Sequence, residues 1–142
     1  MSDIMIFYPV FAQVVLTFVL LYVTGRVRIA SIARGEVEVR DIACGQNAWP
    51  GRATRFANTY NSQFQLPVLF YAVSIFAQIN DAVDVVLIAL AWGFVATRLA
   101  HAWIYVTYNN LRQRFVAFVA GFAMLAVMWG YLGLTLVMTG GK

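Results

Sequence analysis

Arginine, histidine and tyrosine recur at helical spacing in one of the most hydrophobic parts of the sequence. Residues 98–112 carry them three or four positions apart, as Arg98, His101, Tyr105, Tyr108 and Arg112. At about 100° per residue, these side chains fall within roughly 80° of one another on one face of a helix. An arginine inside a membrane costs several kcal/mol unless it meets a partner or water, so we expect this stripe to face a bundle interior or a cavity.

A second polar stripe lies earlier in the chain. Residues 55–71 read RFANTYNSQFQLPVLFY, in which Arg55, Asn58, Asn61 and Gln65 follow spacings of three, three and four. Pro67 is expected to kink this helix or to mark a join between two helices. Two facing polar stripes could simply satisfy each other's hydrogen bonds, which is the structural interpretation of the pattern.

The functional interpretation follows from the kind of polar group present. Both stripes consist of arginine, histidine, tyrosine and amide side chains, and neither contains a carboxylate. Such a donor-rich site favours an anionic ligand, whose carboxylates could pair with guanidinium groups. A tyrosine hydroxyl or an arginine could also stabilise a thiolate by lowering the pKa of the thiol.

Other chemistries lack the residues that they need. The chain has one histidine and one cysteine, and its hydrophobic segments hold no acid, so no metal site is expected. No serine–histidine–acid constellation and no glycine-rich phosphate loop is present. A proton-driven transporter would normally need an intramembrane carboxylate. The net charge of +4 gives no reason to expect nucleic acid as a partner.

Composition indicates which elements must position the stripes. Hydrophobic residues make up 62% of the 142 residues and charged residues 11%, against about 45–50% and about 25% in soluble domains. About 20 apolar residues are enough for a helix to cross a bilayer. The sequence therefore predicts an all-α integral membrane protein, a single domain over 1–142, whose transmembrane helices form a four-helix bundle at about 5–24, 58–79, 83–109 and 113–138.

Charge predicts the orientation of this multi-pass protein. The connection at about 25–57 holds six arginines and the third connection two more, whereas Asp3, Asp81 and Asp84 lie opposite them. Because basic connections stay in the cytoplasm, both termini are predicted on the non-cytoplasmic side. The first helix lacks the basic start and the cleavage site of a signal peptide, so it is expected to be retained. Cys44 falls in the predicted cytoplasmic loop and is interpreted as an incidental thiol.

These segments resemble the MAPEG family, the membrane-associated proteins in eicosanoid and glutathione metabolism. RLAHAWIY (98–105) is similar to the family's third-helix pattern of arginine, then histidine or tyrosine, then tyrosine. TGRVRIA (24–30) resembles its first-helix exit, and residues 55–71 resemble its second-helix motif. The resemblance implies a homotrimer of four-helix subunits, with glutathione bound between subunits near the cytoplasmic side and lipophilic substrates entering from the bilayer.

The resemblance also implies roles for individual residues. Together with the two stripes, it predicts a glutathione site formed by Arg28, Arg55, Asn58, Asn61, Gln65, Arg98, His101, Tyr105 and Tyr108. Arg112 or Arg114 would stabilise the thiolate, and the motif does not choose between them. The family's second-helix glutamate appears here as Gln65, or as Gln63 in another register, so the partner of the glutathione amino group loses its charge. Phe115 stands where the prostaglandin synthase has serine, so that activity is not expected.

Two functions are compatible with these residues. The first is a glutathione-dependent membrane transferase or peroxidase that acts on lipophilic electrophiles through an arginine-stabilised thiolate. The alternative is a non-catalytic trimeric membrane scaffold, or a subunit that binds lipid or another ligand. The expected partners are further copies of the chain, membrane lipids and a lipophilic small molecule, with glutathione as co-substrate and without metal or nucleic acid.

Overall fold

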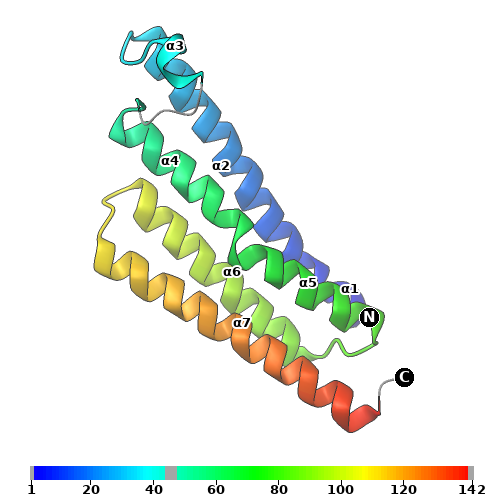
Figure 1. Ribbon diagram of the computed structural model, residues 1–142. Coiled ribbons are helices and arrows are strands. Elements are labelled where there is room, and N and C mark those ends of the chain that lie inside the picture. The colour runs from blue at the N-terminus through cyan, green and yellow to red at the C-terminus, as the bar shows by residue number, and fades with distance from the viewer. Residues whose placement is uncertain (1, 44–47, 141–142) are drawn as a thin grey trace.

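The computed structural model describes residues 2–43 and 48–140, and within these ranges all regular structure is helical. Four long segments are α2 (Phe7–Ala33), the span 51–79, α6 (Val85–Val106) and α7 (Leu111–Thr139), and they run side by side as a bundle (Figure 1). Each is long and apolar enough to cross a membrane. The predicted four-helix membrane bundle is therefore confirmed.

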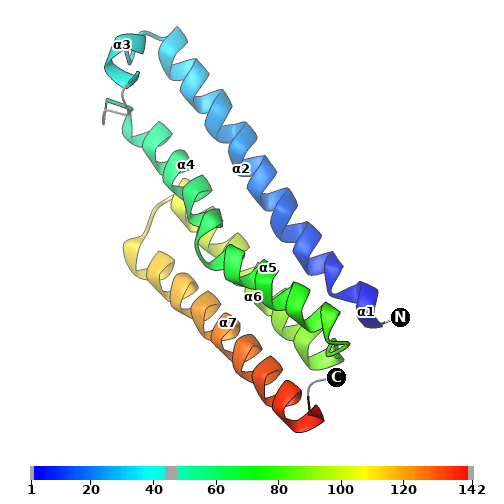
Figure 2. The ribbon, with the colours of Figure 1, turned by 45° about the vertical axis from the view of Figure 1, so that its right-hand side comes forward.

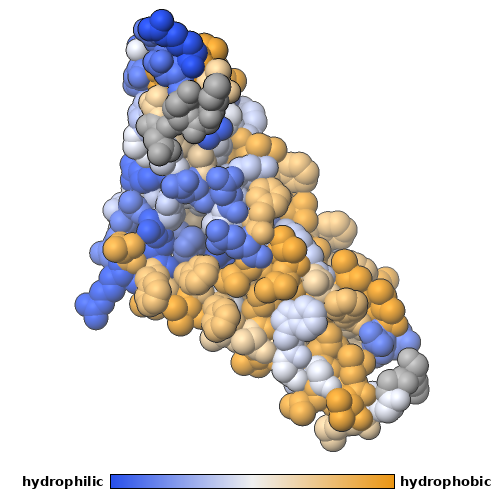
Figure 3. Space-filling view, in the orientation of Figure 1, coloured by the Kyte–Doolittle hydropathy of each residue, from blue (hydrophilic) through white to orange (hydrophobic). Residues whose placement is uncertain are grey.

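The two ends of the bundle differ. Both described chain ends lie together at one end, which we call the terminal end (Figure 2). The other, the arginine end, holds the short helix α3 (Val39–Ile42) and the turn between α6 and α7. Figure 3 shows hydrophilic surface at the arginine end and largely hydrophobic surface over the rest of that face.

Helix α2, preceded by the short α1 (Ser2–Met5), ends nine residues later than the predicted boundary near residue 24. About half of the expected 25–57 loop is therefore part of the long helical segments, because α2 continues to Ala33 and the next long segment begins at Gly51. Arginine is a good helix former, so the apolar run marks the end of hydrocarbon contact and not the end of the helix. Gly35, with φ of 70°, terminates α2 in a Schellman motif. Cys44 lies outside the described residues.

The span 51–79 consists of three pieces. Helix α4 (Gly51–Asn61) passes into one 3-10 turn, η1 (Ser62–Phe64), and α5 (Leu66–Ile79) follows. Gln65 breaks the helix between them, with φ of −98° and ψ of −102°. Pro67 lies in the first turn of α5, where its missing N–H removes no helical hydrogen bond. The predicted join at this proline is confirmed.

Helices α6 and α7 form a tight hairpin. The Asp84 carboxylate caps α6 by accepting from the Leu87 N–H at 2.9 Å, and Asn110 caps α7 in the same way. Because α6 ends at Val106, Tyr108 and Arg112 lie beyond it. The prediction that one helical face carries all five stripe residues is wrong after Tyr105, since the turn redirects the chain.

The packed core divides along the bundle axis. Toward the terminal end it is apolar, with the Phe70 and Phe94 rings stacked at 4.7 Å between centroids and Leu87 and Met128 fully buried. Closer to the arginine end the buried side chains become polar: Gln13, Thr59, Gln63, Arg98 and His101. The candidate site lies in this polar half.

Candidate functional site

A cavity of about 510 Å³ opens among α4, η1, α6 and α7. We call it the polar cavity; it is lined by Asn58, Asn61, Ser62, Gln65, His101, Tyr105, Leu111, Arg114, Phe115 and Phe118. Six of the eleven predicted site residues meet there, from three separate segments of the chain. Leu111, Phe115 and Phe118 add an apolar wall that the spacing of polar residues could not indicate.

The helix break at Gln65 decides which glutamine reaches the polar cavity. Gln63 is buried toward α2, where its Oε1 accepts from Gln13 Nε2 at 2.8 Å and its Nε2 donates to the Thr59 carbonyl at 2.9 Å. Gln65, on the other side of the break, is exposed and lines the cavity. Of the two registers open from the sequence, the structure places Gln65 in the site.

Arg98 lies behind the polar cavity and does not line it. Its side chain is only 1% exposed, and Nη2 donates to Ser62 Oγ at 2.9 Å and to the Ser62 carbonyl at 3.3 Å. Nε and Nη1 find no partner among the described residues. A 3-10 turn leaves carbonyls weakly bonded, so Arg98 stabilises the break that presents Ser62 and Gln65.

Arg114 is held in a fixed position at the polar cavity. Its Cζ lies 4.1 Å from the centroid of the Tyr105 ring, and its Nη1 donates to Asn109 Oδ1 at 2.7 Å. Asn109 adopts a left-handed backbone with φ of 48°, which asparagine tolerates better than most residues. Sequence analysis missed Asn109, although the paired asparagines in YNN (108–110) are a turn signal.

His101 lines the polar cavity, although one of its ring nitrogens is buried. The residue is buried, and its Nδ1 has no hydrogen-bond partner in the part of the chain that the structure describes. Its ring centroid lies 6.0 Å from that of Tyr105 and 6.2 Å from that of Phe118. This nitrogen is itself buried, so a ligand in the cavity contacts other atoms of His101.

The remaining predicted residues lie elsewhere. Arg28 stacks on Trp49, with Cζ 4.8 Å from the ring centroid. Arg55 Nη1 donates to the Thr107 carbonyl at 3.1 Å and so satisfies the end of α6. Tyr108 is exposed and donates to Gln113 Oε1 at 2.6 Å. The structure does not bring these three predicted ligands into the polar cavity.

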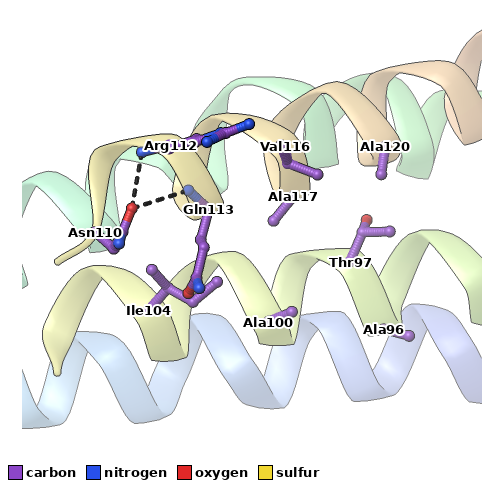
Figure 4. Close-up of a pocket in the computed structure, with 10 residues that line it drawn as sticks. All are labelled: Ala96, Thr97, Ala100, Ile104, Asn110, Arg112, Gln113, Val116, Ala117 and Ala120. Atoms are coloured by element: carbon purple, nitrogen blue, oxygen red, sulfur yellow. Dashed lines mark hydrogen bonds between the residues drawn. The ribbon is translucent and has the colours of Figure 1, made fainter. Parts of the chain in front are cut away.

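Arg112 lines a different hollow, which we call the apolar groove. It measures about 820 Å³ and lies between α6 and α7, lined by Ala96, Thr97, Ala100, Ile104, Asn110, Arg112, Gln113, Val116, Ala117 and Ala120. Figure 4 shows Gln113 reaching toward Ile104, whereas the Arg112 side chain runs along α7. The groove and the polar cavity share no lining residue.

Negative charge is concentrated away from the polar cavity. The ion pairs between described residues all lie at 34–41, where Arg34 meets Glu36 and Arg40 meets Glu38 and Asp41. Within 2–43 and 48–140, no three His, Cys, Asp or Glu side chains come together in a way that could hold a metal ion. The polar cavity therefore offers hydrogen-bond donors and one guanidinium, which suits an anion.

Comparison with known proteins gives one match. The sequence profile of the MAPEG family matches residues 6–134, nearly the whole chain. No curated protein and no solved structure matches significantly. The matched range includes every residue that lines the polar cavity.

Proposed function

Because the chain belongs to the MAPEG family, we propose that it is a glutathione-dependent membrane transferase or peroxidase that acts on lipophilic electrophiles. Membership places this integral, multi-pass protein in membrane-based glutathione and eicosanoid metabolism in general. The observation that carries the finer proposal is the polar cavity, where amides, His101, Tyr105 and Arg114 converge from three segments.

Glutathione suits the donors of the polar cavity. Its two carboxylates can accept from the amide groups of Asn58, Asn61 and Gln65, and its peptide groups can pair with His101. The apolar wall suits the hydrophobic part of an electrophile that enters from the bilayer. Arg98 acts indirectly in this proposal, since its guanidinium holds Ser62 in place.

Arg114 is the proposed thiolate-stabilising group. Its guanidinium is already positioned by Tyr105 and Asn109, so little ordering is needed when a thiol arrives beside it. The positive charge favours the thiolate and lowers the pKa of the bound thiol. In the transferase reaction the sulfur forms a bond to an electrophilic carbon as the leaving group departs. In the peroxidase reaction the thiolate sulfur bonds to one peroxide oxygen as the O–O bond breaks, and the other oxygen leaves as an alkoxide that is protonated to the alcohol. A second glutathione then attacks the sulfur of the resulting sulfenic acid, giving glutathione disulfide and water.

The exposure of polar side chains supports assembly into a homotrimer. Asn58, Asn61 and Gln65 are exposed on the single subunit although they belong to a membrane-length span. Polar groups that face hydrocarbon are costly, so we expect neighbouring copies to cover this face and to complete the site. Native mass spectrometry from mild detergent is expected to show three-subunit particles; monomers alone, with the fold intact, would contradict the assembly.

The charge distribution supports a cytoplasmic arginine end, with both termini on the other side. Gly51 and Thr139 are exposed at opposite ends of the bundle and give sites for a test. In a Cys44→Ser background, Gly51→Cys is expected to resist an impermeant thiol reagent added outside intact cells, whereas Thr139→Cys reacts. The reverse pattern would overturn the orientation.

The decisive test of the function is binding followed by thiolate detection. Calorimetry with glutathione on the detergent-purified protein is expected to show saturable binding, and ultraviolet difference spectra to show a thiolate at neutral pH. Absence of binding would overturn the proposal. Binding without thiolate, and without turnover of a lipophilic electrophile, would instead favour the non-catalytic scaffold, for which the neutral Gln65 is the supporting observation.

A further inference from the structure

The charged side chains at the polar cavity are all positive, because the acidic residues of the chain lie elsewhere. Arg114 lines the cavity, and a second guanidinium, that of Arg98, lies directly behind Ser62. The six acidic residues stand at positions 3, 36, 38, 41, 81 and 84. Residues 42–80 and 85–142, which include everything that lines the cavity, therefore contain no carboxylate side chain.

The acids are also far from Gln65 along the bundle axis. Gln65 lies fourteen residues from either end of the span 51–79, and the acids cluster beyond those ends. At about 1.5 Å per residue, this separation is roughly 20 Å in each direction. Every copy of the chain has the same distribution, so a neighbouring subunit of the same orientation brings no carboxylate to the level of Gln65 either.

The charged groups of glutathione are expected to behave differently in such a site. Its carboxylates gain charge-assisted hydrogen bonds from guanidinium and amide donors. Its ammonium group meets the same two positive charges and finds only neutral oxygens to accept its protons. Gln65 lines the cavity and is exposed, and its neutral amide can accept a hydrogen bond from an ammonium group but gives it no opposite charge.

We propose that the polar cavity binds glutathione but prefers a thiol that carries carboxylates and no ammonium group, and that Gln65 determines this selectivity. The preferred ligand class is an acidic thiol whose amino group is missing or acylated. This inference rests on the proposed function, because it concerns the ligand of the same thiol-binding site. Its test must therefore compare two thiols and not only detect one.

The experiment measures two affinities by calorimetry on the full-length protein in detergent. The probes are glutathione and its desamino analogue, glutaryl-cysteinylglycine, which differ only in the ammonium group. The S-methyl derivatives of both are measured as well, because they cannot form a thiolate and so report the ammonium alone. The wild-type protein is expected to bind the desamino analogue about tenfold more tightly in both pairs.

Two variants locate the cause. Gln65→Glu is expected to reverse the preference toward glutathione by about tenfold. Gln113→Glu makes the same chemical change on α7 outside the polar cavity, at a residue that lines the apolar groove, and is expected to leave the ratio unchanged. Size-exclusion profiles confirm that each variant keeps its assembly.

The outcomes separate this inference from the proposed function. If the wild-type protein binds glutathione as tightly as the analogue, or more tightly, the selectivity is refuted and the proposed function stands. If Gln113→Glu shifts the ratio as much as Gln65→Glu, the assignment to Gln65 is refuted. If neither thiol binds, the proposed function fails and the selectivity fails with it. The wild-type ratio decides the matter even if Gln65→Glu does not fold.

Discussion

The α6–α7 hairpin separates two hollows of opposite character. On one side, the polar cavity is lined by amides, His101, Tyr105 and Arg114. On the other, the apolar groove is lined mostly by alanine and other apolar side chains, with Arg112 near one end (Figure 4). Two successive α7 arginines thus enter different environments, because a step of two residues turns about 200° around a helix.

The contrast shows that an arginine's surroundings, more than its presence, decide what it can do. Arg114 is fixed beside the polar cavity by the Tyr105 ring and by the Asn109 amide oxygen, so its positive charge has a defined position there. The Arg112 side chain is exposed and forms no hydrogen bond or ion pair with the described residues. A fixed charge beside a cavity can stabilise a developing anion, whereas an exposed one is screened by solvent and salt.

The largest expected effect is the loss of thiolate in Arg114→Gln. A charge-assisted hydrogen bond contributes about 1.5–3 kcal/mol, so the bound thiolate fraction and the turnover rate should fall by about tenfold to a hundredfold. Arg112→Gln is the matched control and should change neither value by more than about twofold. Ultraviolet difference spectra and initial rates measure both. Equal losses in the two variants would remove the functional distinction between the two hollows.

Much of the fold could be predicted because apolar runs of membrane length are the strongest signal in this sequence. The starts near 7, 85 and 111 and the ends near 79, 106 and 139 were predicted to within a few residues. The exit of α2 and the start of α4 were not, since both continue as polar helix beyond the apolar run. Helices outside hydrocarbon are specified by caps and by contacts, and a hydropathy pattern does not report these.

The site could be predicted where helical periodicity holds and not where it stops. His101 and Tyr105 lie within α6, and Asn58 and Asn61 lie within α4, so regular spacing brings each pair to the same cavity. The choice between Arg112 and Arg114 depends on where α6 ends and how residues 107–110 turn. This turn includes one left-handed residue, Asn109, and the stripe pattern carries no information about it.

The next effect concerns the wall between the two hollows. A Cβ placed on Gly121 would lie 2.8 Å from Thr97 Oγ1, so α6 and α7 approach closely only because this residue is glycine. Gly121→Ala is expected to destabilise the protein by about 1–3 kcal/mol, as overpacked cores generally do. A tryptophan-fluorescence thermal melt in detergent would detect this as a lower melting temperature.

Two controls make the Gly121 experiment specific. Gly130, on the same helix, would place its Cβ in open space, so Gly130→Ala should be neutral or stabilising by up to about 1 kcal/mol. Thr97→Ala removes the hydroxyl that Gly121→Ala would meet, so the double variant should recover much of the lost stability. If Gly121→Ala melts at the wild-type temperature, the hairpin is less tightly packed than the structure indicates.

The smallest expected effect is the one that most directly tests whether the two hollows are independent. Ala117 and Phe118 are neighbours on α7, yet Ala117 lines the apolar groove and Phe118 lines the polar cavity. Ala117→Leu extends into the groove, so glutathione affinity should stay within about twofold of wild type. Phe118→Ala removes part of the cavity wall beside His101 and should weaken binding by several-fold. Calorimetry on both variants measures the two glutathione affinities. A loss of affinity in Ala117→Leu as large as that in Phe118→Ala would mean that the groove and the cavity act as one site across the hairpin.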